Sequence, residues 1–248
     1  MSVAIVPKQK MIDIHMHLIP GVDDGAENME MALIMMNQAK EQGITRIIAT
    51  PHSEAFCYSR EGGKIIFKRL ADLAAKLCPE VKLYLGCEVY CETTIMDQVM
   101  EALGSGRYPT MNGTQYVLME FYQWVSPENT VPCVEALIKA GYIPIVAHME
   151  RYIYLRDNMQ LVDQFRNMGA LVQLNAYSLF DEMDDTIKHW ARALVKERKV
   201  DFLGTDAHRT YHRPPSAQRG LNWLYENTDW EYADAIAFGN AQLLLTRM

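Results

Sequence analysis

The sequence predicts an α/β protein: a single distorted (β/α)7 barrel, similar to a TIM barrel, followed by additional C-terminal helices. Seven short runs of apolar and β-branched residues alternate with longer segments in which apolar residues recur at helical spacing. This alternation is typical of a parallel sheet with crossover helices. The 248 residues show no composition shift that marks a boundary, and α/β barrels often have roughly 200 to 250 residues in one domain. We therefore expect one domain over 1–248, with its core at about 11–215 and C-terminal helices at 216–248.

Each predicted element follows from the local pattern. The strands are predicted at 11–17, 44–50, 81–89, 115–121, 143–148, 170–175 and 200–205. The first helix, 28–42, starts at Asn28, which favours the N-cap, and stops at Gly43. Its methionine-rich apolar face predicts core packing. Further helices are predicted at 62–77, 93–103, 127–140, 158–168 and 183–198, and near the C-terminus at 214–226, 230–238 and 240–246.

Composition excludes several classes of protein. Lys plus Arg is 24 and Asp plus Glu is 31, so the net charge is −7 and the isoelectric point is near 5.5. This acidity argues against nucleic-acid binding. No run approaches the roughly 18 apolar residues that span a membrane, and the apolar run at 3–6 is too short for a signal peptide. The five cysteines are odd in number and contain no CxxC pair, so we expect a reduced, cytoplasmic protein.

Histidines gather where the predicted strands end. In a parallel barrel the loops that follow the strands build the active site. Five of the seven histidines and four carboxylates fall at or near these ends: His15, His17, Asp24, His52, Glu88, Glu120, His148, Asp206 and His208. A single strand-end histidine is usually a satisfied core residue, but nine ligand-type groups at one rim predict a metal site. Asp23 is interpreted instead as an N-cap of the following helix, and His189 and His212 as surface residues.

The pattern on the first strand supports this interpretation. Asp13, His15 and His17 alternate with apolar residues and therefore share one face. Three buried polar groups on one face are costly unless something pairs them. Imidazoles and carboxylates without thiolates suit Mn, Fe or Zn, whereas Ca or Mg prefer oxygen ligands. Nine ligands exceed the need of one ion, so we expect two or three. Such sites catalyse displacement at phosphorus or hydrolysis of acyl derivatives.

Two arginines favour a phosphate substrate. Arg151 follows His148 by three residues and can bind a phosphoryl group bidentately; the alternative is a salt bridge to a nearby carboxylate. Arg213 is a second candidate. Aromatic residues also crowd the predicted rim, where they could stack on an aromatic substrate or pack the barrel: Phe56, Tyr58, Phe121, Tyr122, Trp124, Tyr152, Tyr154 and Tyr177.

The combined motifs resemble those of the polymerase-and-histidinol-phosphatase (PHP) superfamily. More narrowly, the chain is similar to the bacterial manganese-dependent protein-tyrosine phosphatases of capsule and exopolysaccharide operons. Between Met11 and Pro215 the matching stretches are MIDIHMHLIPGVDDGA, IIATPH, LGCEVY, YVLMEF, PIVAHMERY, QLNAYS and LGTDAHRT followed by RPP.

The resemblance implies a trinuclear centre on the PHP form of the (β/α)7 barrel. His15, His17, Glu88 and Asp206 would hold one metal. Glu88, as a bridge, would hold the second with Glu120 and His148, and Asp24, His52 and His208 would hold the third. Arg151 would bind phosphate, with Glu120 and Asp206 taking part in catalysis and Asp13 and Asn175 lying behind the ligands. Manganese is the expected metal, with Fe, Zn or Mg as alternatives. The implied substrate is phosphotyrosine on a partner bacterial tyrosine kinase.

The cysteines exclude the thiol-based route to phosphotyrosine hydrolysis. That route needs Cys, five residues and then Arg, but the residues six positions after the cysteines are Gly63, Tyr84, Thr93, Asp97 and Lys139. We therefore expect direct in-line attack by a metal-bridging hydroxide, with Arg151 and the metals stabilising the developing charge. No side chain is assigned as general acid.

Two other functions stay open. The first is a PHP-type small-molecule phosphatase that acts on histidinol phosphate. The second is a non-catalytic adaptor that binds a kinase. A metal-dependent amidohydrolase is disfavoured because the sixth strand ends in Asn175 and Asp206 is followed closely by His208.

Overall fold

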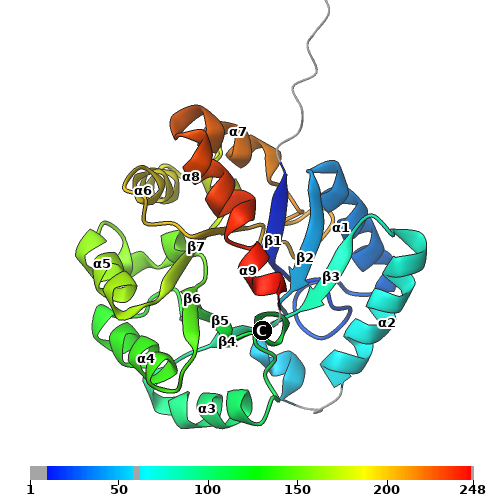
Figure 1. Cartoon of the computed structure of the whole chain (residues 1–248), viewed down its shortest axis with the longest axis horizontal. Coiled ribbons are helices and arrows are strands. Elements are labelled where there is room, and N and C mark those ends of the chain that lie inside the picture. The colour runs from blue at the N-terminus through cyan, green and yellow to red at the C-terminus, as the bar shows by residue number, and fades with distance from the viewer. Residues whose placement is uncertain (1–9, 58–61, 247–248) are drawn as a thin grey trace, which may run out of the picture.

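The computed structural model describes residues 10–57 and 62–246 (Figure 1). The predictions for the apolar run at 3–6 and for Tyr58 lie outside the described residues.

Parallel strands form the centre of the molecule and confirm the α/β class. One sheet has the order β1-β2-β3, and the second has the order β4-β5-β6-β7-β8. All their pairings are parallel. The strands are β1 (Met11–Met16), β2 (Ile44–Ala49), β3 (Lys82–Leu85), β4 (Glu88–Tyr90), β5 (Tyr116–Glu120), β6 (Ile143–Val146), β7 (Leu171–Asn175) and β8 (Phe202–Gly204).

The predicted strand at 81–89 is wrong as a single element. The chain divides at Gly86 and Cys87, so that β3 pairs with β2 whereas β4 pairs with β5. A Cβ atom on Gly86 would lie only 3.0 Å from side-chain atoms of Ile48, Thr50 and Met111, so the backbone here passes so close to its neighbours that glycine is favoured. The described residues therefore contain eight strands in two sheets instead of seven in one.

Two isolated bridges connect the two sheets. Met16 pairs with Ala207, and His52 pairs with Glu88. Backbone hydrogen bonds reinforce both places: His17 N donates to Ala207 O at 2.9 Å, and Glu88 N donates to Pro51 O at 3.0 Å. These contacts bring the ends of β1, β2 and β8 and the start of β4 together, where the predicted ligands lie.

Helices surround the strands (Figure 1). The outer ring contains α1 (Met29–Glu41), α2 (Gly62–Leu77), α3 (Met96–Gly104), α4 (Pro127–Lys139), α5 (Met159–Met168) and α6 (Asp185–Lys196). Helix α1 begins as predicted, because the Asn28 side chain accepts a hydrogen bond from Met31 N at 2.9 Å. Its methionine-rich face is buried, which confirms core packing.

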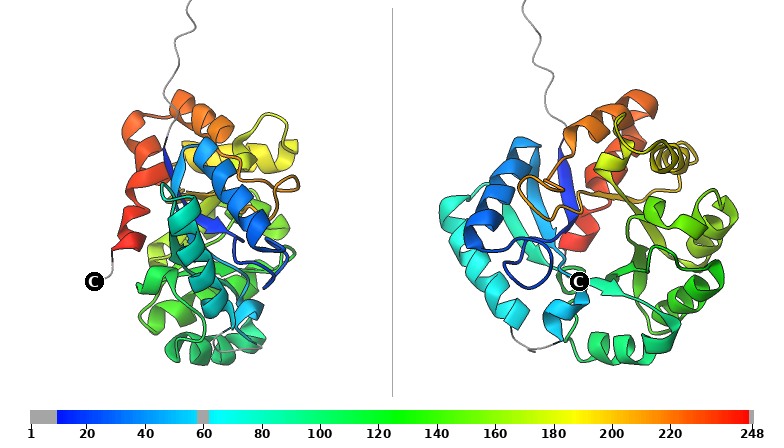
Figure 2. Two further views of the ribbon diagram at one scale, coloured as in Figure 1. Left: turned by 90° about the vertical axis from the view of Figure 1, so that its right-hand side faces the viewer. Right: turned by 180° about the vertical axis from the view of Figure 1, so that it is seen from behind.

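The C-terminal helices cover the end of the strands opposite the ligand-bearing loops. They are α7 (Gln218–Asn227), α8 (Trp230–Asp234), a π-helical turn (Ala235–Gly239) and α9 (Gln242–Leu245). Figure 2 shows α8 and α9 on one side of the molecule and the loop after β1 on the other. Leu244 of α9 packs in a buried cluster with Ile12, Ile14 and Ile48. This apolar cluster closes one end of the strands, whereas the loops at the other end remain accessible.

None of the helices in the described part of the chain is both long enough and apolar enough to span a membrane.

Candidate metal centre

All nine predicted ligand residues come together at the rim formed by the strand ends. They make four overlapping groups whose ligand atoms lie within 4.8 Å of one another. The groups are His17, Asp24, His52 and His208; His15, Glu88 and His148; His15, His17 and Asp206; and His52, Glu88 and Glu120.

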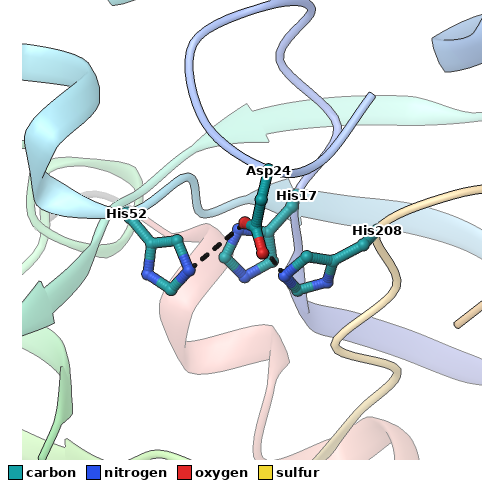
Figure 3. A group of neighbouring side chains, drawn as sticks. All are labelled: His17, Asp24, His52 and His208. Carbon is teal, nitrogen blue, oxygen red and sulfur yellow. Dashed lines mark ion pairs between the residues drawn. The ribbon is translucent and has the colours of Figure 1, made fainter. Parts of the chain in front are cut away.

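Asp24 joins two imidazoles at the open side of the centre (Figure 3). Its Oδ1 atom lies 3.4 Å from His52 Nε2 and 3.3 Å from His208 Nε2. Behind it the rings of His17 and His208 stack with their centroids 3.8 Å apart. Asp24 is the most exposed of the four residues, so a ligand that enters from solvent reaches this group first.

On the buried side of the cluster, the Glu88 carboxylate contacts the largest number of imidazoles. Its Oε1 atom lies 3.1 Å from His15 Nε2 and 2.8 Å from His148 Nε2. Its Oε2 atom lies 3.1 Å from His17 Nε2 and 3.2 Å from His52 Nδ1. One carboxylate that faces four imidazoles with both oxygens has the geometry of a bridging ligand.

Two further carboxylates lie on either side of Glu88. Asp206 Oδ1 lies 3.6 Å from His15 Nε2 and 3.5 Å from His17 Nε2. Glu120 Oε1 lies 2.9 Å from His52 Nδ1, and Glu120 Oε2 lies 3.9 Å from His148 Nε2. Every imidazole of the cluster therefore faces at least one carboxylate.

Hydrogen bonds at the outer ring nitrogens orient the buried imidazoles. His15 Nδ1 lies 3.1 Å from Gln173 Oε1, and His208 Nδ1 lies 2.9 Å from the carbonyl oxygen of Asp206. His17 Nδ1 lies 2.8 Å from Asp23 Oδ2. Such partners fix the tautomer and turn the Nε2 lone pair toward a metal. Sequence reasoning missed Gln173, which lies in the matching stretch QLNAYS but was given no role there.

The interpretation of Asp23 as an N-cap is wrong. Asn28 caps α1, whereas Asp23 accepts hydrogen bonds from Gly25 N at 3.0 Å and from His52 N at 3.1 Å in addition to its contact with His17. The Asp23 side chain thus organises the loop that carries Asp24. The adjacent pair of aspartates in the loop after β1 was the signal that could have identified it.

The protonation of the cluster shows how well the residues fit divalent cations. Burial by itself raises the pKa of Glu88, but the charge of His15 and hydrogen bonds from the imidazoles hold it well below its ordinary value. Burial lowers the pKa of His52, but hydrogen bonds with Asp24 and Glu120 raise it to about 10. Without metal, protons on His15, His17 and His52, whose pKa values are raised, therefore offset the charge of the carboxylates. His148 Nδ1 is also buried without a hydrogen-bond partner among the described residues. Nitrogen and carboxylate donors held this closely fit divalent cations.

Both candidate phosphate-binding arginines point into the same cavity. Arg151 donates to Asp206 Oδ2 at 2.8 Å. Arg213 also donates to Asp206 Oδ2, and one of its nitrogens lies 3.2 Å from His208 Nε2. The cavity has a volume of about 330 Å³ and is lined by both arginines together with Glu120 and His148. The salt bridge anticipated for Arg151 is thus formed, at the mouth of the metal-type cluster.

The residues behind the ligands act in different ways. Asp13 Oδ1 accepts from His15 N at 3.1 Å and from Thr205 N at 2.9 Å, so it ties β1 to the end of β8 without touching a ligand side chain. Burial raises the pKa of Asp13 to about 6. Asn175 does touch a ligand, because its Nδ2 donates to Asp206 Oδ2 at 3.0 Å.

Glu150 is a further residue that sequence reasoning missed. It is fully buried, and its Oε1 atom accepts hydrogen bonds from Asn175 N at 3.1 Å and from Ser178 Oγ at 2.7 Å. It therefore anchors the loop that carries Arg151 to the end of β7. His189 and His212 are exposed, as expected, and belong to none of the four groups.

The fold and the cluster define a class: a parallel α/β protein with a cluster of metal-type ligand residues at the rim of its sheets. The chain belongs to the family described as "Capsular polysaccharide synthesis, CpsB/CapC", whose model matches residues 11–246. This match confirms the family resemblance that the motifs carried.

Several proteins similar to this chain are named as tyrosine-protein phosphatases. The chain is 34% identical over 206 residues to the putative tyrosine-protein phosphatase CapC of Staphylococcus aureus, covering 82% of this chain and 79% of the relative. It is 31% identical over 235 residues to the tyrosine-protein phosphatase YwqE of Bacillus subtilis, covering 95% and 91%. It is 29% identical to the tyrosine-protein phosphatase CpsB of Streptococcus agalactiae, covering 95% and 98%.

Solved structures agree with this assignment. One match comes from crystal structures of YwqE from Bacillus subtilis and CpsB from Streptococcus pneumoniae, described as unique metal-dependent tyrosine phosphatases; its TM-score is 0.82 at 29% identity, with 96% of each chain covered. An amidohydrolase from Mycoplasma synoviae matches with a TM-score of 0.62 at 11% identity, covering 97% of this chain and 89% of that one. The second likeness concerns the fold alone.

Proposed function

We propose that this protein is a metal-dependent protein-tyrosine phosphatase. Its substrate would be phosphotyrosine on a bacterial tyrosine kinase that regulates capsule or exopolysaccharide synthesis, in the cytoplasm. The observation that carries the proposal is the placement of Arg151 and Arg213 on Asp206, at the mouth of a cluster of five imidazoles and four carboxylates. A pair of guanidinium groups beside a multimetal centre suits a phosphate ester better than an acyl substrate.

The nine ligand residues would hold two or three divalent ions, with manganese expected and Fe, Zn or Mg as alternatives. His15, His17, Glu88 and Asp206 would hold one ion, and Glu88, Glu120 and His148 a second. Asp24, His52 and His208 would hold the third. When bound, the ions would supply positive charge and lower the pKa of a water molecule.

The chain's own residues would bind and orient the phosphoryl group. Arg151 has five donors in a planar fork and can turn from Asp206 to phosphoryl oxygens. Arg213, on the loop after β8, lines the same cavity and can bind the same group. As charge grows on the phosphoryl oxygens during displacement, these preorganised donors stabilise it. Asn175 keeps Asp206 in place through its 3.0 Å hydrogen bond.

The cysteines support a route without a thiol nucleophile. Burial raises the pKa of the Cys87 and Cys91 thiols well above their ordinary value. Cys57 is exposed, and its sulfur lies 3.3 Å from the hydroxyl of Tyr108. None of the cysteines lines the cavity that contains the arginines.

The experiment that tests this proposal compares substrates. Purified protein with added Mn²⁺ is assayed on a phosphotyrosine peptide, histidinol phosphate and p-nitrophenyl phosphate, each with and without EDTA, beside the His148→Ala variant. We expect Mn²⁺-dependent turnover with preference for the phosphotyrosine peptide and loss of activity in the variant. Preference for histidinol phosphate would assign the small-molecule reaction instead. No turnover of any ester would leave an adaptor role.

A further inference from the structure

Three exposed aromatic side chains lie together beside the cavity: Tyr122, Trp124 and Tyr154, here called the aromatic ledge. Their exposed fractions are 60%, 45% and 57%, respectively. The rings of Trp124 and Tyr154 meet edge to face with centroids 6.0 Å apart. The other large exposed apolar side chains of the described chain are dispersed over α1, α2, α8, α9 and the loop after β8: Ile34, Ile65, Leu77, Trp230, Leu243 and Tyr211.

Hydrogen bonds hold the two loops of the ledge together. Ile153 N donates to Gln123 O at 2.8 Å, which joins the loop after β6 to the loop after β5. Phe121 N donates to the hydroxyl of buried Tyr152 at 3.1 Å, and these two rings pack edge to face below the ledge. The ledge is therefore a surface fixed by its own loops, which lowers the entropy cost of binding to it.

The ledge is continuous with the cavity. Tyr122 and Gln123 line the cavity wall, in which Arg151 also lies, whereas Trp124 and Tyr154 lie outside that wall. Pockets for drug-sized ligands begin at about 300 Å³, so a cavity of about 330 Å³ takes one phosphorylated side chain. The residues on either side of that side chain in a protein substrate must then lie outside the cavity, along its edge.

We propose that the aromatic ledge binds the peptide residues that flank the phosphotyrosine. This inference rests on the proposed phosphatase function and specifies its substrate as a polypeptide segment with apolar or aromatic side chains beside the phosphotyrosine. Aromatic rings contribute large contact areas at low conformational cost, and they are enriched among the residues that dominate binding energy in protein interfaces. A small ester that fits within the cavity gains nothing from Trp124 or Tyr154.

The test separates peptide from small-ester turnover. Trp124→Ala, Tyr154→Ala and the double variant are assayed on a phosphotyrosine peptide with flanking aliphatic and aromatic residues, and on p-nitrophenyl phosphate. Trp230→Ala is the matched control, because Trp230 is also exposed but lies on α8. We expect kcat/KM for the peptide to fall about tenfold in the double variant, mainly through KM, and kcat/KM for p-nitrophenyl phosphate to stay within twofold. Trp124→Phe should recover part of the loss.

Binding gives a readout that does not depend on turnover. The affinity of the same peptide with a non-hydrolysable phosphonate in place of phosphate should weaken about tenfold in the double variant and remain unchanged in Trp230→Ala. If kcat/KM fell equally on the peptide and the small ester, or fell on neither, peptide binding by the aromatic ledge would be refuted. The proposed phosphatase function would stand. Wild-type preference for histidinol phosphate would instead overturn the proposed protein-tyrosine phosphatase function.

Discussion

Arg151 donates a hydrogen bond to Asp206 at 2.8 Å, so a candidate phosphate-binding cation and a candidate metal ligand are paired directly. Asp206 is 1% exposed and also receives hydrogen bonds from Arg213 and Asn175. Burial raises the pKa of Asp206, but the positive charge of His15 and hydrogen bonding to His17 outweigh burial and hold it well below its ordinary value. The Asp206 carboxylate is thus ionised. A metal that binds this carboxylate would therefore affect where the Arg151 side chain lies.

Replacement of Arg151 should reduce catalysis more than folding. We expect Arg151→Ala to lower kcat/KM on a phosphotyrosine peptide by about 100-fold or more, because loss of one preorganised donor to a developing oxyanion costs about that much. Arg151→Lys should recover only part of it, since a lysine cannot bind bidentately. Arg107→Ala, which removes an arginine paired with Glu101 on the surface, is the control. Equal activity in Arg151→Ala and Arg107→Ala would refute the assignment.

Glu88 should be required for the metal content of the protein. The Glu88→Gln variant keeps the shape of the side chain but loses the charge that faces four imidazoles. We expect it to retain fewer Mn²⁺ ions per chain after dialysis, as measured by plasma mass spectrometry. Glu101→Gln, at an exposed surface pair, should retain the wild-type content. A Glu88→Gln variant with full metal content would contradict the bridging role.

Metal binding should become tighter as the pH rises. The pKa of His52 is raised to about 10 and that of His17 well above its ordinary value, so both rings hold protons at neutral pH without metal. A metal must displace these protons. We expect Mn²⁺ affinity to increase from about pH 6.5 toward pH 10, with proton release detected by titration calorimetry in buffers of different ionisation enthalpy.

The same shifts determine the stability of the metal-free form. A histidine with a raised pKa contributes stability that is fully present below the unfolded value of about 6.5. For His52 this contribution is lost as the pH rises through about 10. The Tm of chelator-treated protein should therefore fall across this window while the gain in Tm on adding Mn²⁺ increases. A Tm gain that is independent of pH would argue against proton displacement.

Variants of Asp23 and Asn28 should distinguish a role in metal binding from a role in helix capping. Asp23→Ala removes the partner of His17 Nδ1, and loss of such a partner typically weakens metal affinity about 10- to 100-fold. Asn28→Ala removes the cap of α1 and should cost about 1 kcal/mol of stability with unchanged metal affinity. If Asn28→Ala weakened metal binding as much as Asp23→Ala, the two roles would not be distinct.

The convergence of the ligand-type residues could be predicted from sequence because parallel strands bring their ends together. His15, His52, His148 and His208 are far apart in the chain, yet each lies at or just after a predicted strand, and that regularity predicted that they would meet. The break at Gly86 was not predicted, because the run at 81–89 is short enough for one strand and the division depends on the contacts of Gly86 with Ile48 and Thr50. Periodicity carries no information on such close approach between strands.

Residues that orient the ligands were harder to find for a related reason. Gln173 and Glu150 act through hydrogen bonds to residues distant in the sequence, His15 and Ser178 among them. A buried glutamine on a strand or a glutamate next to an arginine is common in many proteins. Only the three-dimensional arrangement distinguishes their roles.

We propose that one polynuclear centre, built from five histidines and four carboxylates, drives hydrolysis of phosphotyrosine. Titration of Mn²⁺ into chelator-treated protein, with metal content and phosphotyrosine-peptide turnover followed in the same samples, tests this proposal. We expect no turnover without metal and full turnover at two or three ions per chain. Turnover that survives chelation, or that saturates at a single ion, would contradict it.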